Sequence, residues 1–300
     1  MRVAIAGGTG FIGRALTKAL IARNDEIWII SRKSSSEPQH YAGQHHATWE
    51  EIAEKPSILD GIDAIINLTG ESINQRWTDA AKQRILESRQ SAAARIATLY
   101  QALNDKPKVV INASGISAYG ISANRTFDES SPTAITDFLS EVVQKWEIAA
   151  DAIPARRLVK LRVGVVLHKK DGAFPLMAMP YRLFGGGKIG SGKQWLSWIH
   201  LEDMVRLIIF CLDNDQIRGP VNGCAPDPVT NDAFGRAIGK AMGRPHWFPV
   251  PAFVMKTLFG EMSTLLLDGQ RAMPAKALEH GFAFRYPTVD SAMQELVGRR

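Results

Sequence analysis

Three glycines near the start of the chain have the spacing of a phosphate-binding turn. Gly7, Gly10 and Gly13 form a G-x-x-G-x-x-G pattern directly after the apolar residues 3–6. In such a turn the first glycine permits a tight bend, the second lets the backbone approach a pyrophosphate, and the third lets a helix pack close to a strand. The phosphates then lie at the helix N-terminus, where free N–H groups favour negative charge. The pattern predicts a dinucleotide site.

Other candidate contacts come from the same turn and from the ends of later strands. Ligands of such folds lie outside the carboxyl ends of parallel strands, where several turns meet. The alternative, a glycine-rich turn that binds nothing, needs no such contacts. The predicted cofactor-binding residues are Gly7, Thr9, Gly10, Phe11, Ile12, Gly13, Ser31, Arg32, Leu68, Thr69, Gly70, Arg89 and Arg162.

The end of the second predicted strand indicates which dinucleotide is bound. An acidic residue there would bind the ribose 2′-hydroxyl of NAD and repel a 2′-phosphate. The sequence has Ser31, Arg32 and Lys33 instead. A guanidinium forms paired, charge-assisted hydrogen bonds to phosphate. We therefore predict NADP as the cofactor, with a basic loop that binds nothing as the alternative.

The elements that must position these residues alternate between strand and helix up to about residue 167. Residues 34–57 interrupt the pattern; they are polar and irregular, with a short acidic helix at 50–54. Alternation of this kind is typical of a parallel sheet covered on both faces, so we predict an α/β Rossmann fold with a doubly wound parallel sheet. The predicted strands are 3–6, 26–30, 63–68, 109–113 and 158–167, and the predicted helices are 11–20, 78–103 and 138–152.

The pattern changes beyond residue 167. Residues 171–197 are rich in glycine, methionine and aromatic side chains, and 187–193 approach a P-loop. Gln194 stands where a Ser or Thr would hold magnesium, and no strand precedes the segment, so we reject a triphosphate site and expect a flexible loop over the substrate. An apolar helix at 203–213, a short strand at 220–222 and helices with Pro-rich joints from about 226 follow.

We therefore predict two domains. Residues 1–167 form an NADP-binding Rossmann domain, to which 198–225 return. Residues 168–197 and 226–300 form a small, mostly helical C-terminal domain that covers the substrate.

Composition narrows the class of protein. The apolar share of 45% and the charged share of 22% are ordinary for a globular enzyme. The net charge of +6 suits an anionic ligand. We expect no nucleic-acid partner, because no run of about five like charges and no nucleic-acid motif is present. Cys211 and Cys224 have neither disulfide nor metal spacing, so we expect no metal.

Two features of the sequence indicate the cellular location of the protein. No apolar run reaches the ~18 residues of a transmembrane helix, so we expect no membrane partner. The nucleotide-binding strand opens the chain and is expected to leave no room for a signal peptide. We therefore expect a cytoplasmic protein with a small-molecule substrate, and a homodimer as one assembly to test.

Several motifs together resemble the extended short-chain dehydrogenases/reductases. They are residues 7–13, 114–120 and 198–203. The closer resemblance is to an atypical, NAD(P)-dependent epimerase-like subgroup, on residues 67–71, 146–147, 187–192, 198–200, 260–261, 269–271 and 281–282. It covers essentially the whole chain and implies a Rossmann domain that binds NADP(H) and a small C-terminal domain. It implies no particular reaction, because members are labelled nucleoside-diphosphate-sugar epimerases by similarity.

The chain departs from these relatives at the catalytic pair. Relatives carry Tyr-x-x-x-Lys, in which the lysine lowers the pKa of a tyrosine that exchanges a proton with the substrate. Alignment on Glu147 puts Leu139 and Val143 at these positions, and no tyrosine here has a lysine four residues on. The usual proton-transfer groups are absent.

Two hydroxyl groups are our candidates to replace them. Ser114 ends a predicted strand, one residue before the position where relatives place a catalytic hydroxyl, and Tyr119 follows shortly after. We predict Ser114 and Tyr119 as catalytic residues and keep Glu71 as an alternative base. For His200, whose motif usually packs, we favour a structural role.

The favoured function is an NADP(H)-binding oxidoreductase or epimerase-like enzyme. Its substrate is expected to be a small polar or nucleotide-linked molecule. The missing Tyr-x-x-x-Lys pair keeps an alternative open, namely a non-catalytic binding module that senses NADP(H) and acts through a partner.

Overall fold

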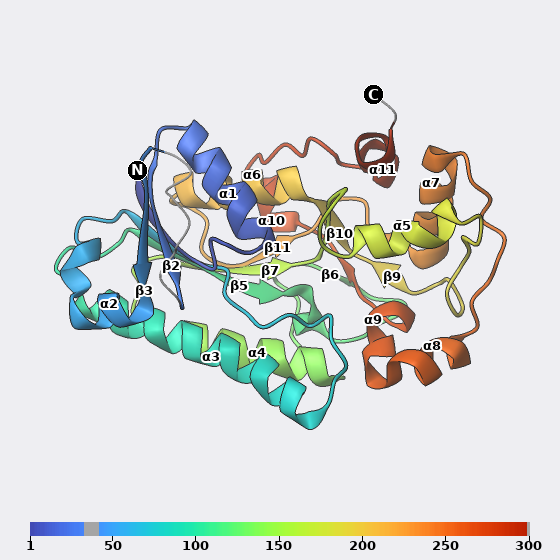
Figure 1. The fold of residues 1–300 in the computed structure, drawn as a ribbon, viewed down its shortest axis with the longest axis horizontal. Helices are drawn as coiled ribbons and strands as arrows, with labels where there is room; N and C mark the ends of the chain where they lie inside the picture. The colour runs from blue at the N-terminus through green and yellow to red at the C-terminus, as the bar shows by residue number, and fades with distance from the viewer. Residues whose placement is uncertain (33–41, 299–300) are drawn as a thin grey trace.

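A computed structural model describes residues 1–32 and 42–298 (Figure 1). At its centre lies a seven-stranded parallel sheet in the order β11-β7-β5-β4-β1-β2-β3. The chain starts in the interior of the sheet at β1 and extends it first to one side and then to the other, so the predicted doubly wound sheet is confirmed. The strands are β1 Arg2–Ala6, β2 Glu26–Ser31, β3 Gln44–Thr48, β4 Ala64–Asn67, β5 Val109–Gly115, β7 Leu158–Val163 and β11 Gly219–Gly223.

Helices cover both faces of this sheet. Helices α1 (Phe11–Ala22) and α6 (Leu201–Asp213) pack together on one face, and α3 (Asp79–Ala102) and α4 (Phe138–Asp151) on the other (Figure 1). Because successive strand residues point to opposite faces, β1 contributes Val3 and Ile5 to one core and Ala4 and Ala6 to the other.

A third apolar core lies beyond the sheet. It joins α5 (Phe174–Arg182), α7 (Asn231–Met242) and α11 (Val289–Val297) through buried side chains such as Phe234 and Met293. In Figure 1, α5, α7 and α8 (Ala252–Phe259) form the end of the molecule opposite α2 (Trp49–Glu54). The remaining helical elements are η1 Pro56–Leu59, η2 Ile116–Tyr119, η3 Gly260–Ser263, α9 Thr264–Leu267 and α10 Ala275–Glu279.

Short strand pairs connect this region to the sheet. β8 (Val165–Leu167) pairs with β10 (Trp198–His200) in a separate two-stranded sheet, and β11, within residues 198–225, pairs with β7 of the central sheet. Phe282 packs in the core with α1 and α6, so part of the C-terminal segment also contacts the sheet domain. The other pairs are β9 Trp195–Leu196 with β12 Val229–Thr230, and β6 Thr126–Phe127 with β13 Arg271–Ala272.

Three of the differences between the structure and the sequence prediction have a direct physical reason. β3 lies in a stretch expected to be irregular; as an edge strand it needs one hydrogen-bonding partner, β2, and tolerates polar side chains. The predicted strand 158–167 is broken at Gly164, where a Cβ would lie 2.6 Å from the carbonyl oxygen of Ser197. The predicted loop 171–197 contains α5, because Phe174, Ala178 and Tyr181 share one buried face.

The rest of that loop is held by defined hydrogen bonds. The N–H groups of Trp247 and Phe248 donate to the carbonyl of Gly186, and the N–H of Ile189 donates to Asn231 Oδ1 at 2.9 Å. Helix α5 thus corrects the expected loop over 174–182, whereas residues 183–194 form a loop whose glycines serve close backbone packing. A Cβ on Gly187 would lie 1.9 Å from the carbonyl oxygen of Phe248.

Candidate functional site

The glycine turn that joins β1 to α1 has a closely packed backbone. Gly7 has a φ of +82°, and a Cβ there would lie 2.9 Å from the carbonyl carbon of Leu68. A Cβ on Gly13 would lie 2.2 Å from the carbonyl oxygen of Gly7. Gly10 differs, because it is exposed, its φ is −74°, and a Cβ would lie 3.2 Å from the nearest atom. The fold requires Gly7 and Gly13, whereas a Cβ on Gly10 would make one tight contact, with the carbonyl oxygen of Gly7.

The N-terminus of α1 is open to an anion. Gly10 is the N-cap, no side chain among the described residues caps the first turn, and that turn contains no acidic residue. Thr9 is exposed beside it, and Phe11 and Ile12 are half-buried on the first turn. Free N–H groups and the positive end of the helix dipole make this a site for phosphate.

The end of β2 lies beside the turn. The N–H of Gly7 contacts the carbonyl of Ile30 at 3.4 Å, so Ser31 and Arg32 follow directly at the same edge. Ser31 is half-buried and Arg32 is exposed. Lys33 lies outside the described residues. Among the described residues, this strand end therefore has a cation, and no acid, where a ribose 2′-substituent would lie.

The end of β4 forms the other side of the turn. The backbone N–H of Thr69 donates to Asn67 Oδ1 at 3.1 Å. The side-chain oxygen of Thr69, Oγ1, is buried and has no hydrogen-bond partner among the described residues. Leu68 contacts the Gly7 position, as the distances above show. A buried hydroxyl with no partner, next to an open helix N-terminus, fits a site that a polar ligand completes.

Arg89 holds this loop from behind. Its Nη1 donates to the carbonyls of Glu71 and Ile85 at 3.0 and 2.9 Å, and its Cζ would lie 3.0 Å from a Cβ on Gly70. Burial lowers the pKa of Arg89 to about 10. Ser88 Oγ also accepts from the N–H of Glu71. The structure thus brings Arg89 to the predicted site, as a support for the loop backbone.

A row of polar side chains crosses the ends of three strands. In the sheet register Ser114 of β5 pairs with Arg162 of β7, which pairs with Asn222 of β11. Residues at the same register of parallel strands share one face. All three are at least nine-tenths buried. The structure therefore brings together Ser114 and Arg162, which lie far apart in the sequence.

Glu147 of α4 connects two members of this row. Ser114 Oγ donates to Glu147 Oε1 at 2.7 Å, and Arg162 donates through Nε and Nη2 to the two carboxylate oxygens at 2.8 and 2.9 Å. Burial alone would raise the pKa of Glu147, but the hydrogen bonds and charge of Arg162 hold that pKa below its ordinary value. The carboxylate is therefore ionised at neutral pH.

Tyr119 closes the network from η2. Its hydroxyl donates to Asn222 Oδ1 at 2.8 Å, and its ring lies 4.8 Å from Arg162 Cζ and stacks on Phe127. Burial raises the pKa of Tyr119 to about 12. The Tyr119 side chain is therefore a neutral hydroxyl, and its hydrogen atom forms the hydrogen bond to Asn222.

The position of the usual catalytic pair is apolar. Leu139 and Val143 are both buried, and a Cβ on Gly115 would lie 3.1 Å from Val143 Cγ2. Val143 thus lies directly beside the end of β5. No proton can come from either side chain.

The two remaining candidates have other partners. His200 Nδ1 accepts from the N–H of Glu202 and caps α6, while its Nε2 lies 3.0 Å from Glu295 Oε2, in agreement with a structural role. Glu71 Oε1 is 3.4 Å from the side-chain amide of Gln75. Because this contact is long, the carboxylate of Glu71 stays an alternative base.

Sequence reasoning missed the parts played by Glu147 and Asn222. Glu147 served as an alignment marker, and Asn222 was treated as part of a short strand. The sequence feature that could have indicated these roles is a polar residue within an apolar stretch. Such a residue is buried with its neighbours and therefore needs a buried hydrogen-bonding partner. Asn67 and Asn112 carry the same signal, since Asn67 Nδ2 donates to Asn112 Oδ1 at 2.7 Å.

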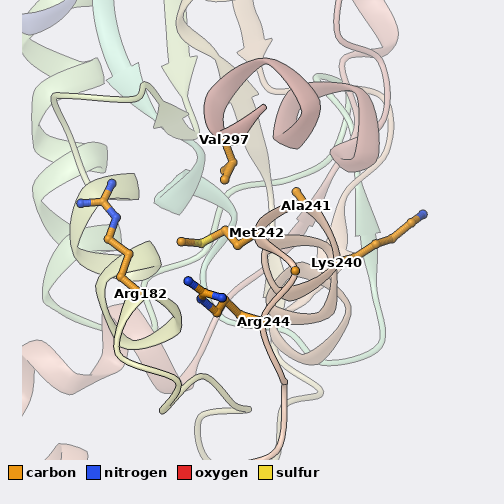
Figure 2. A pocket seen from close by; sticks show the side chains of 7 residues that line it. Arg182, Lys240, Ala241, Met242, Arg244 and Val297 are labelled. Carbon is orange, nitrogen blue, oxygen red and sulfur yellow. The ribbon is translucent and has the colours of Figure 1, made fainter. Parts of the chain in front are cut away.

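A surface hollow of about 760 Å³ lies elsewhere, among α5, α7 and α11 (Figure 2). Arg182, Lys240, Met242, Arg244 and Val297 are among its lining residues. None of the residues predicted from the sequence lines it. We place the candidate site at the glycine turn and the strand ends.

Two family models match the chain. The NAD dependent epimerase/dehydratase family matches residues 3–138, and a domain of unknown function, DUF1731, matches residues 250–296. The first match contains the glycine turn and the ends of β2, β4 and β5.

Individual proteins match over the full length. The epimerase family protein YfhF of Bacillus subtilis is 43% identical over 100% of this chain and 99% of its own. A crystal structure of human epimerase family protein SDR39U1 (isoform 2) with NADPH has a TM-score of 0.92 and 37% identity over 100% of both chains. A nucleoside-diphosphate sugar epimerase from Corynebacterium glutamicum has a TM-score of 0.79 and 30% identity over 99% of this chain and 58% of that one.

Proposed function

Because this chain belongs to the NAD-dependent epimerase/dehydratase family, we propose that it is an NADP(H)-binding oxidoreductase or epimerase-like enzyme. The observation that carries the proposal is the open N-terminus of α1 behind Gly10. The similar human protein was crystallised with NADPH, which supports the same cofactor here.

The residues present fit this cofactor. The first turn of α1 would hold the pyrophosphate on its N–H groups, and Thr69 Oγ1 is a buried hydroxyl that lacks a partner beside it. Leu68 and Gly70 would line the adenosine side. Ser31 and Arg32 would bind the 2′-phosphate, and Arg162, at the strand ends, would sit near the nicotinamide end.

Replacing Arg32 by Ala is expected to weaken NADPH binding about 10- to 150-fold and NADH binding little, because a charge-assisted hydrogen bond contributes ~1.5–3 kcal/mol. Arg32 is exposed, so the fold should not change. Titration calorimetry with both dinucleotides measures the ratio. Equal weakening of both would show that Arg32 does not recognise the 2′-phosphate.

When bound, the cofactor donates or accepts a hydride. The chain itself must then orient the substrate and hold a proton. The Ser114 hydroxyl donates a hydrogen bond to Glu147. Its oxygen can therefore accept a hydrogen bond, for example from a substrate hydroxyl. Tyr119 fixes Asn222 and lies against Arg162, at the same strand ends.

The variants Ser114→Ala and Tyr119→Phe are expected to lower turnover by about 10²–10⁴, the usual contribution of a positioned acid or base. NADPH should still bind, because neither residue lies at the glycine turn. Turnover is measured on a panel of carbonyl compounds and sugar nucleotides, which represent the small polar or nucleotide-linked substrates we propose. Full turnover in both variants would remove these residues from the chemistry and leave Glu71 or the substrate's own groups.

The substrate side is proposed to lie between the two lobes. Residues 1–167 with 198–225 would hold the cofactor, and 168–197 with 226–300 would cover the substrate. The separate core around Phe234 and Met293 supports such a division.

One observation favours a second candidate, a non-catalytic NADP(H) sensor. Both candidate hydroxyls already donate to buried acceptors, and Leu139 and Val143 replace the usual pair. A sensor would show no turnover on the panel while NADP and NADPH change the binding of a partner differently. An enzyme would show turnover that depends on Ser114 or Tyr119.

A further inference from the structure

Among the large apolar side chains that are more than half exposed at the end of the molecule formed by α5, α7 and α8 (Figure 1), six directly follow α5 or lie on α8 and the segment before it. We call them the apolar tip. Helix α8, with the sequence AFVMKTLF, has no buried residue. The apolar tip consists of Leu183, Phe184, Trp247, Phe248, Phe253 and Leu258.

Hydrogen bonds hold three of these residues in one place. Trp247 Nε1 donates to the carbonyl of Phe184 at 2.8 Å, and the N–H groups of Trp247 and Phe248 both donate to Gly186. Leu183 precedes Phe184, and α8 starts four residues after Phe248. With about 150–250 Å² for a fully exposed aromatic side chain, the tip exposes roughly 700 Å². This exceeds the ~300–600 Å² of the largest patch on a typical monomer.

Cations surround the apolar tip. Arg182, Lys188 and Arg244 form no salt bridge within the part of the chain that the structure describes, and Lys256 has an electrostatic interaction with Asp268. Arg244 Cζ lies 4.1 Å from the ring centroid of Phe184. The acidic residues of α7 and α11 nearby are already paired, Asp232 with Arg236 and Asp290 with Lys240. The surface around the tip therefore has more positive than negative charge, with Asp268 as the acid that faces Lys256.

The hollow of Figure 2 lies next to the tip. Met242 and Arg244 point toward α5, which carries Arg182, while Lys240 points the other way. Two guanidinium groups and the apolar side chains of Met242 and Val297 thus line one space. Such a space suits a phosphate that is attached to an apolar chain.

We propose that the apolar tip docks on an anionic phospholipid surface, with the aromatic side chains inserted among the lipids and the surrounding cations on the headgroups. Exposed Trp and Phe beside Lys and Arg have this preference. A second copy of the chain fits less well, because a two-fold interface would bring the same unpaired cations together. From the sequence we expected no membrane partner. No helix within residues 1–32 and 42–298 could span a bilayer, but surface docking requires none.

The test is flotation of the full chain with phosphatidylcholine vesicles, with or without phosphatidylglycerol. We expect binding only to the anionic vesicles, and release by salt. Lys256→Glu on α8 should weaken binding about 25-fold, since each charge near such a surface contributes about fivefold. Lys55→Glu is the matched control, because Lys55 is an exposed lysine beside α2 at the opposite end of the molecule.

A second variant tests the apolar contribution. Phe253→Ser with Leu258→Ser should weaken vesicle binding by about tenfold or more, while NADPH binding reports that the fold is intact. Three results would overturn the proposal. The wild-type protein stays unbound with anionic vesicles; Lys55→Glu weakens binding as much as Lys256→Glu; or sedimentation shows a dimer that the double variant abolishes, which assigns the tip to a second copy.

Discussion

A Gly10→Val protein is expected to fold normally and to lose NADPH affinity by at least about 100-fold. The backbone of Gly10 has extended angles that valine adopts readily, and a Cβ would make one tight contact, at 3.2 Å from the carbonyl oxygen of Gly7, which a small shift of the turn relieves. The branched side chain would instead occupy the open space at the N-terminus of α1. The loss of two charge-assisted hydrogen bonds from phosphate to N–H groups, at ~1.5–3 kcal/mol each, accounts for the magnitude.

Gly13→Val is the matched control for this variant. The chemical change is the same, but the new Cβ would lie 2.2 Å from the carbonyl oxygen of Gly7 and 2.7 Å from Gly8 Cα. It should therefore lower the thermal midpoint of unfolding, whereas Gly10→Val should not. Calorimetric titration and thermal denaturation of both proteins separate the two effects. Unchanged NADPH affinity in a folded Gly10→Val protein would refute the proposed pyrophosphate site.

Glu147→Gln is expected to reduce the free energy of unfolding by about 3–5 kcal/mol. The substitution leaves the Arg162 guanidinium buried without its counter-charge, and an uncompensated buried charge has this cost. Replacing both residues by apolar ones, as in Glu147→Leu with Arg162→Met, should recover much of the loss. Urea denaturation gives the free energies. A single-variant effect below ~1 kcal/mol would show that solvent reaches the pair.

The contribution of Glu147 should also depend on pH, with a definite sign. Its pKa in the folded protein lies below the ordinary value of 4.5. The stabilisation is therefore complete above that value and is lost as the pH falls through the lower pKa of the folded protein. The difference in unfolding free energy between wild type and Glu147→Gln should be constant near neutral pH and shrink in acid. A difference that grows in acid would contradict the assignment.

The elements predicted correctly are those whose signal is local. The turn at Gly7, helix α3 and helix α4 each combine a periodic pattern with its own cap or glycine within one stretch of chain. β3 was missed, because its polar residues qualify as a strand only through the neighbouring β2. α5 was missed because Pro180 and the flanking glycines suggest a loop, while its buried face is defined by contacts with α7.

The candidate site likewise contains some residues that a local sequence pattern predicts and others that it does not. The glycine turn and Arg32 follow from spacing and residue type. The connection of Ser114 to Arg162 depends on the register between β5 and β7, and Glu147 completes it from another element. Register and helix placement are decided by packing over the whole domain, and no local pattern in the sequence contains them.

The buried network beneath the strand ends keeps one protonation state over a wide range of pH. The pKa of Glu147 is held low, the pKa of Tyr119 is raised to about 12, and the pKa of Arg162 is raised by its bonds to Glu147 despite burial. Between these limits the three side chains together are electrically neutral and exchange no proton with solvent. A substrate bound at the strand ends, as we propose, would meet dipoles of constant strength and direction. Any change of rate with pH near neutrality would originate in a group outside this network.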